Sequence, residues 1–142
     1  MSHLNNTTKK PMKPFESRDL KDLHPILADA YLKAEEIFNS QNGDVNVIRT
    51  CTFRNNAMQQ VYFNKRPKIT NARPGESPHN YNPSFAFDIA FVRNRQLDWS
   101  SKYFKAFADI IKSISNDVEW GGDWVRFKDA PHFELKNWRA KI

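Results

Sequence analysis

Apolar side chains recur at steps of three and four residues in the first third of the chain. The stripe starts just after Pro25 and stops before Asn42-Gly43, and its members are Ile26, Leu27, Ala30, Ala34, Ile37 and Phe38. This spacing places them on one face of a helix, and proline is well tolerated in a first helical turn. We therefore predict a helix that begins at Pro25 and ends at Asn42-Gly43. His24, directly before it, is best explained as a capping or packing residue.

Three segments alternate between apolar and polar residues with an approximate period of two, which is typical of strands. They are residues 45–53, residues 85–91 and, near the end of the chain, residues 131–135. Successive side chains of a strand point to opposite faces of the sheet. In the second segment Asp88 lies opposite the phenylalanines, so we expect its carboxylate to face away from the aromatic core.

Two further helices and a long irregular loop complete the pattern. A short helix is predicted over about residues 56–63. Residues 103–114 form an amphipathic helix whose apolar face contains Tyr103, Phe104, Phe107, Ile111 and Ile114. Residues 64–83 are too rich in proline for regular structure. Loops of this length in a compact domain are uncommon unless they have a function, so this loop indicates a site.

Length and composition are those of one compact domain. The chain has 142 residues, of which 39% are hydrophobic, and its 11 Phe and 4 Trp supply enough apolar bulk for one core. Helices interspersed with separated strands favour the α+β class. Residues 1–16 are polar and contain several lysines and prolines, so we predict a flexible N-terminal arm followed by a folded domain over residues 17–142.

The positive net charge of the chain indicates which kinds of partner it could bind. A formal net charge of +6 favours anionic partners such as nucleic acid, phospholipid or cell-wall polymers. The basic residues are scattered, without a basic helix or zinc-finger spacing, so we do not expect nucleic-acid binding. The sequence has no apolar run of the length of a membrane span and no apolar segment typical of a secretion signal at its N-terminus. We therefore expect neither a membrane span nor export by a signal peptide.

The single cysteine, Cys51, excludes an internal disulfide, so stability must come from packing or from a metal. Cysteine and histidine together can form the nucleophile and base of a cysteine peptidase. Cys51, however, belongs to an alternating apolar strand, and a buried, inert thiol explains it better.

Histidines and carboxylates in the long loop and the last two strands could hold a metal. A catalytic zinc needs three protein ligands of these types and one open position. His79 lies in the loop, Asp88 follows it by nine positions, and His132 shares one face of the last strand with Glu134. Asp129 lies close to His132 in sequence, where a carboxylate could act as general base. Two histidines and an aspartate also occur together by chance in many proteins.

Four motifs, in order and spacing, resemble those of the zinc D-alanyl-D-alanine and L-alanyl-D-glutamate peptidases. They are Ser77-Pro-His79, Ala86-Phe-Asp88, Trp120-Gly-Gly-Asp123-Trp124 and Asp129-Ala-Pro-His132-Phe-Glu134. Two earlier segments, Asp22-Leu-His-Pro25 and Thr52-Phe-Arg54 with Gln59 after it, also look like this family. The resemblance covers about residues 18–138 and is closest to phage endolysins that cleave between L-alanine and D-glutamate. It implies an antiparallel sheet flanked by helices, as in hedgehog domains and DD-peptidases.

The resemblance also implies roles for individual residues. His79, Asp88 and His132 would bind one zinc ion per chain. Asp129 would be the catalytic base, and Arg54 would contact the substrate and stabilise the developing oxyanion, although Arg54 could instead be a structural ion-pair partner.

Some of the roles implied by the resemblance rest on shorter motifs, and others stay open. Gln59 and Ser77 fall where the family places residues that line the substrate site. The aromatic residues of the turn at Trp120 and Trp124 would either wall the cleft or pack as a corner of the core. One departure is the span from His79 to the aspartate, which is longer here than in the more usual form of the family.

The resemblance leaves several functions to distinguish. We expect a zinc endopeptidase that cuts peptidoglycan stem peptides during host lysis, waits in the host cytoplasm, acts as a monomer and is attracted to anionic cell-wall polymers. One alternative is a D-alanyl-D-alanine carboxypeptidase or dipeptidase of the same family. Another is a binding module that kept the zinc but lost catalysis. The presence of Asp129 argues against the binding module.

Overall fold

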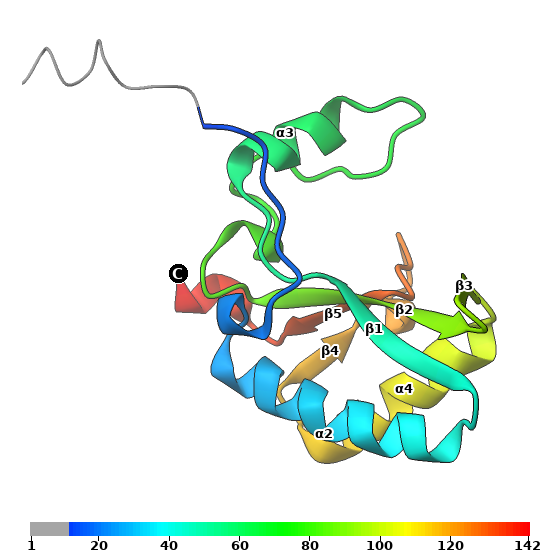
Figure 1. The fold of residues 1–142 in the computed structure, drawn as a ribbon. Coiled ribbons are helices and arrows are strands. Elements are labelled where there is room, and N and C mark those ends of the chain that lie inside the picture. The colour runs from blue at the N-terminus through cyan, green and yellow to red at the C-terminus, as the bar shows by residue number, and fades with distance from the viewer. Residues whose placement is uncertain (1–11) are drawn as a thin grey trace, which may run out of the picture.

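A computed structural model describes residues 12–142 and shows an open antiparallel sheet with its two longest helices on one side (Figure 1). The longer helices are α2 (Pro25–Gln41), α3 (Asn56–Asn64) and α4 (Ser101–Ile114). Four short 3-10 helices are η1 (Leu20–Asp22), η2 (Pro78–Asn80), η3 (Gly121–Asp123) and η4 (Trp138–Lys141). The strands are β1 (Val45–Cys51), β2 (Ala86–Arg93), β3 (Gln96–Leu97), β4 (Val118–Trp120) and β5 (His132–Leu135).

The register of the sheet positions the residues of interest. The strand order is β1-β2-β5-β4, and β3 pairs with the far end of β2. Asp88 in β2 lies between two neighbours, because it pairs with His132 of β5 on one side and with Cys51 of β1 on the other. Asp88 and His132, 44 positions apart in sequence, therefore become adjacent through strand pairing alone.

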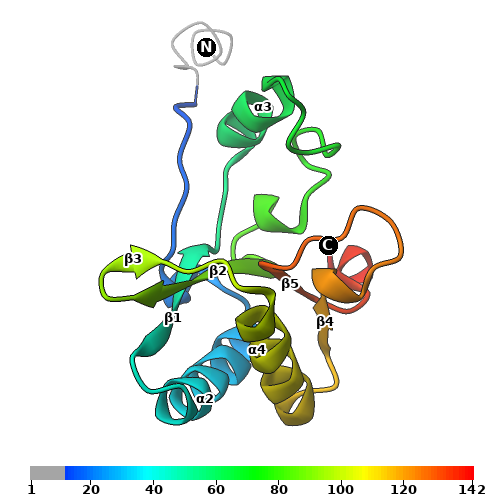
Figure 2. The ribbon, with the colours of Figure 1, turned by 90° about the vertical axis from the view of Figure 1, so that its right-hand side faces the viewer.

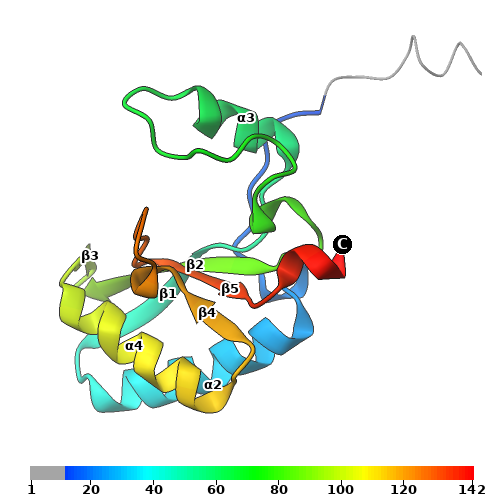
Figure 3. The same ribbon diagram turned by 180° about the vertical axis from the view of Figure 1, so that it is seen from behind.

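The hydrophobic core lies between the sheet and the pair of helices α2 and α4, which cover the same face (Figure 2). Phe87 and Phe133 of neighbouring strands stack with their ring centroids 5.2 Å apart. Phe107 of α4 packs edge-on against Phe133. On the other side of the sheet, Figure 3 shows α3 and the loop after it raised above the strands. The α+β class predicted from the sequence is confirmed.

The predicted helices and the longer strands are present, with ends displaced by a few residues. His24 caps α2 as predicted, because its Nδ1 accepts a hydrogen bond from the Ile26 amide. The periodicity did not predict β3 or β4, which have two and three residues. Segments this short contain too few positions to display a period of two.

The segment before η1 lies along the stretch that follows β1. Backbone bonds join Ser17 to Phe53 and Thr52, and Phe15 to Asn55. The side chain of Asn55 adds two bonds, one from the Phe15 amide and one to the carbonyl of Lys13. These contacts involve the end of the arm predicted over residues 1–16; the rest of that arm, residues 1–11, lies outside the described part of the chain.

Candidate active site

A cleft of about 1180 Å³ is lined by residues of α3, β2 and β5 and by none of α2 or α4. Its floor contains Asp88 of β2 and His132 of β5. One wall comes from α3 and residues 68–79, and the other from residues 124–129. The loop predicted to be functional therefore supplies one wall of this cleft.

His79 is held in η2 by local hydrogen bonds. The Ser77 hydroxyl accepts a hydrogen bond from the His79 amide, and Ser77 with Asn80 forms a capping box around this turn. The Nδ1 atom of His79 lies 2.8 Å from the carbonyl oxygen of Thr52. Because a carbonyl can only accept, Nδ1 carries a proton, and Nε2 faces the Asp88 carboxylate at 3.2 Å.

His132 is oriented by carboxylates on both sides of its ring. Its Nδ1 lies 3.0 Å from Oδ1 of Asp88, and its Nε2 lies 2.8 Å from Oε1 of Glu134. Burial alone would lower the pKa of His132, but the hydrogen bonds to Asp88 and Glu134 outweigh burial and raise it to about 10. The spacing of two positions in a strand predicted that Glu134 shares a face with His132. The sequence alone assigned no role to Glu134.

Asp88 lies between the two histidines. Its Oδ1 contacts both rings, and its Oδ2 lies 3.8 Å from Nη2 of Arg54. Burial would raise the pKa of this carboxyl, but the charges and hydrogen bonds of His79 and His132 hold it well below its usual range. The carboxylate is therefore ionised, as a metal ligand must be.

The distances from the Asp88 carboxylate to the two imidazoles suit a divalent metal ion. Ligand atoms about 2.0–2.1 Å from a tetrahedral ion lie roughly 3.3 Å from one another, close to the 3.0 and 3.2 Å that separate Asp88 Oδ1 from the two imidazole nitrogens. All three residues line the cleft, which leaves a side of the site open to substrate and water. Three protein ligands with an open side are typical of catalytic sites.

Cys51 offers a competing third ligand, since donor atoms of Cys51, His79 and Asp88 lie within 4.8 Å of one another. Its Sγ lies 3.6 Å from His79 Nδ1, however, which is the nitrogen that already donates to Thr52. Cys51 does not line the cleft, and burial raises the pKa of its thiol. Access to the cleft therefore favours His132 over Cys51 as the third ligand, and Cys51 is buried, as its strand position predicted.

Asp129 lies on the same cleft, at the end of the loop before β5. Its backbone amide donates to the Gly121 carbonyl at 3.0 Å, and its carbonyl accepts from the His132 amide at 3.1 Å. Although the side chain is exposed, desolvation by its neighbours raises the pKa of its carboxyl, against the opposing charge of His132. A carboxyl with a raised pKa is better matched to proton transfer near neutral pH.

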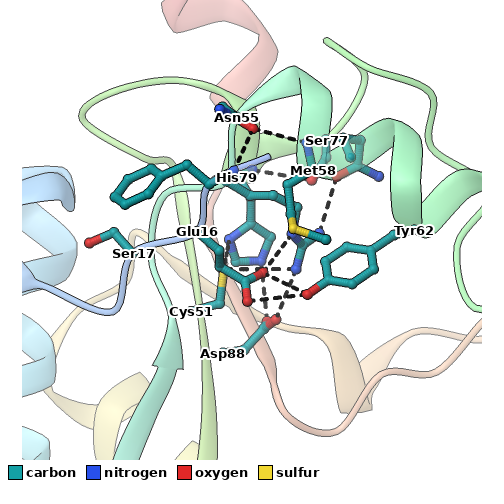
Figure 4. A network of polar contacts seen from close by, with 12 residues as sticks. Glu16, Ser17, Cys51, Asn55, Met58, Tyr62, Ser77, His79 and Asp88 are labelled. Carbon is teal, nitrogen blue, oxygen red and sulfur yellow. Dashed lines mark hydrogen bonds and ion pairs between the residues drawn. The ribbon is translucent and has the colours of Figure 1, made fainter. Parts of the chain in front are cut away.

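Arg54 lines the cleft and contacts Glu16, Gln59 and Asp88. Figure 4 shows the network of polar contacts around His79 and Asp88. Its backbone amide donates to the His79 carbonyl at 2.9 Å. Its Nη1 donates to Oε1 of Gln59 at 3.1 Å. Gln59 itself is fully buried and donates to the Ala72 carbonyl, so it supports Arg54 from behind and is not among the residues that line the cleft.

Ser77 and the two tryptophans take distinct places. Ser77 lines the cleft, but its hydroxyl is used to cap the turn that carries His79. Trp120 is buried, stacks on Phe133 and donates through Nε1 to the Ala130 carbonyl, so it belongs to the core. Trp124 lines the cleft, with its ring centroid 5.5 Å from that of His132. Each alternative left open by the sequence thus holds for one tryptophan.

The sequence is similar to that of known peptidases of the bacterial cell wall. Residues 70–135 match a family model described as D-alanyl-D-alanine carboxypeptidase. The chain is 37% identical over 132 residues to the peptidoglycan L-alanyl-D-glutamate endopeptidase CwlK of Bacillus subtilis, which covers 80% of this chain and 74% of that protein. It is 24% identical over 123 residues to the L-alanyl-D-glutamate peptidase of Listeria phage A118, covering 85% of this chain and 42% of that one.

A solved structure shares the fold. It is the crystal structure of the Serratia marcescens L-Ala D-Glu endopeptidase ChiX, with a TM-score of 0.67 and 23% sequence identity. The match covers 90% of this chain and 93% of that chain. The sheet and its helices are therefore arranged as in that endopeptidase.

Proposed function

Because the chain belongs to the M15 family of metallopeptidases, we propose that it is a zinc endopeptidase that hydrolyses the L-alanyl-D-glutamate bond of peptidoglycan stem peptides. The observation that carries this proposal is the convergence of His79, Asp88 and His132 at the floor of an open cleft that also contains Asp129. The similarity to the L-alanyl-D-glutamate endopeptidase of Bacillus subtilis supports the choice of bond.

His79, Asp88 and His132 would hold the metal through Nε2, Oδ1 and Nδ1. Two imidazoles and one carboxylate form a donor set that zinc commonly takes in peptidases. When bound, zinc supplies Lewis-acid chemistry: it polarises a carbonyl and brings the pKa of water toward ~7. Replacing His79 or His132 by alanine should remove the metal, and elemental analysis of the purified variants tests this assignment.

The protein's own side chains would manage protons and charge. Asp129 accepts the proton of the attacking water and returns it to the amine that leaves, which is how a general base becomes a general acid. The guanidinium of Arg54 stabilises the negative charge that develops on the carbonyl oxygen of the substrate. Trp124 and the wall formed by residues 68–79 bound the space in which the peptide lies.

The nature of the bond is tested by mass spectrometry of purified peptidoglycan after digestion. Cleavage between L-alanine and D-glutamate leaves L-alanine on the glycan strand and a new amino terminus on D-glutamate. The family model that matches residues 70–135 carries the carboxypeptidase description, and an enzyme of that kind releases free D-alanine instead. Free D-alanine without a new D-glutamate terminus would replace our proposal with the carboxypeptidase.

We propose host lysis as the biological setting, with the phage relative as support. The rim of the cleft carries Lys68, Lys128 and Arg139, which would attract anionic cell-wall polymers. No helix within residues 12–142 is long and apolar enough to cross a bilayer. A fall in turbidity of permeabilised bacteria after addition of the protein, abolished by a zinc chelator, would support lysis as its role.

A further inference from the structure

We propose that Glu16 is a positioning residue, whose carboxylate fixes the guanidinium of Arg54 beside the metal-binding residues. The catalytic part of this inference rests on the proposed function. Glu16 precedes Arg54 by 38 positions and lies at the end of the arm predicted over residues 1–16. Its contact with Arg54 makes this end of the arm part of the active site.

The backbone brings Glu16 to this position. The Ser17 amide donates to the Phe53 carbonyl at 2.7 Å, and the Asn55 amide donates to the Phe15 carbonyl at 3.0 Å. Glu16 and Arg54 thereby face each other in an isolated antiparallel bridge. Side chains that lie directly opposite in such a pair are close enough to interact.

The carboxylate of Glu16 is held between Arg54 and Tyr62. It accepts a hydrogen bond from Nε of Arg54 at 3.0 Å, and the Tyr62 hydroxyl lies 3.2 Å from each of its oxygens. The guanidinium carbon of Arg54 also lies 4.6 Å from the centre of the Tyr62 ring. Figure 4 shows the Glu16 carboxylate facing the Tyr62 hydroxyl. The exposed fractions of the Arg54 and Glu16 side chains are 13% and 27%, so solvent weakens this pair less than a surface ion pair.

Fixing Nε determines where the rest of the guanidinium points. The group is planar, so once Nε bonds to Glu16 the two terminal nitrogens point toward Gln59, at 3.1 Å, and toward Asp88 Oδ2 and Cys51 Sγ, each at 3.8 Å. Without Glu16 the cation would be drawn toward the Asp88 carboxylate, a proposed metal ligand. Glu16 thus keeps the positive charge of Arg54 available to the substrate.

The test compares Glu16→Gln with Glu36→Gln, which removes the same charge from an exposed position of α2. We expect Glu16→Gln to lower kcat on a stem peptide by about 10-fold or more, because small displacements of a catalytic group have costs of this order. Zinc content should be kept. Glu36→Gln should leave kcat unchanged. In an Arg54→Ala background, Glu16→Gln should have no further effect, since residues that act through one another are not additive.

A second measurement follows Arg54 directly, by NMR of its Nε–H group. The bond to Glu16 should protect this hydrogen from exchange in the wild-type protein, and Glu16→Ala, which leaves no acceptor, should remove the protection. The inference would be overturned if the separate effects of Glu16→Gln and Arg54→Ala on kcat multiplied in the double variant, or if the Arg54 signal were unchanged in Glu16→Ala. If Glu16→Gln fails to fold, Tyr62→Phe perturbs the same carboxylate and takes its place. If the wild-type protein cleaves no peptidoglycan, the proposed function fails, while the exchange measurement still decides the position of Arg54.

Discussion

The two histidines of the site have their outer nitrogens occupied by different acceptors. His79 donates to a backbone carbonyl, and His132 faces the carboxylate of Glu134. In metal sites such outer partners fix the ring orientation and raise the basicity of the ligand, and carboxylates do so more strongly than carbonyls. The outer partner of His79 is therefore a backbone carbonyl, whereas the orientation of His132 in β5 depends on one ionisable side chain, that of Glu134.

Glu134→Ala is expected to weaken zinc binding by about 10- to 100-fold, because the ring of His132 loses its outer partner. Glu134→Gln should weaken binding less, since its amide oxygen can still accept the Nε2 proton. Zinc affinity measured by competition with a chromophoric chelator checks both variants. Equal affinities in wild-type protein and Glu134→Ala would exclude a role for this carboxylate at the metal.

Asp129→Ala tests the role of Asp129 as general base separately from zinc binding. A general base contributes typically about 100- to 10,000-fold to the rate, whereas the three proposed ligands remain in place. We expect the variant to keep its zinc, measured by elemental analysis, and to lose peptide hydrolysis in a chromatographic assay. Hydrolysis near the wild-type rate would show that another group accepts the proton.

At the scale of elements, the turn around η3 determines where Asp129 lies. The carbonyl of Gly121 accepts the Asp129 amide, and Trp120 bonds to the Ala130 carbonyl. A side chain at Gly121 would collide with the backbone oxygen of Asp129, and one at Gly122 would collide with the ring of Trp120. Glycine is needed at both positions because other segments approach the backbone closely.

Gly121→Ala should therefore displace Asp129 and reduce peptide hydrolysis about 100-fold, a cost typical of a 1 Å displacement of a catalytic group. Zinc content should be retained because no proposed ligand is removed. Asp123→Ala, in the same turn, removes only an exposed ion pair with Lys112 and is the matched control. Comparable activity of the Gly121 variant and this control would mean that the turn does not position Asp129.

Sequence patterns predicted the long elements of the fold but not the shortest strands, for physical reasons. Long periodic segments such as α2 and β2 display their faces clearly, whereas β4 has three residues and joins the sheet through pairing with β5. Pairing across a sheet depends on the tertiary structure rather than on local periodicity. The side chain of Asp88 was predicted to leave the aromatic core, and it does so, because it lines the cleft while its neighbours Phe87 and Ile89 belong to the core.

For the whole molecule, local sequence could identify the candidate ligands but not their support. His79, Asp88, His132 and Asp129 belong to short motifs, and the fold places all four on one cleft. Glu16 has no such motif. Its position depends on backbone bonds between segments more than thirty residues apart, such as Thr52 to Ser17. Contacts of this kind follow from topology and could not be inferred from spacing along one segment.

The three proposed ligands come from η2, β2 and β5, so a bound metal ties the loop wall of the cleft to two strands of the sheet. A ligand that binds only the folded state stabilises it by about 2.7 kcal/mol when present at 100 times its Kd. For a domain of this size that corresponds to a change in Tm of about 5–10 °C. We expect a chelator to lower the Tm by this amount, measured by differential scanning calorimetry, and added zinc to restore it.

The variants Asp129→Ala and His132→Ala are the controls for this measurement. The Tm of Asp129→Ala should respond to the chelator as that of the wild type does, because this variant keeps the ligands. His132→Ala should show little response to the chelator. A wild-type Tm that is indifferent to chelator and zinc would contradict a metal held by these three elements.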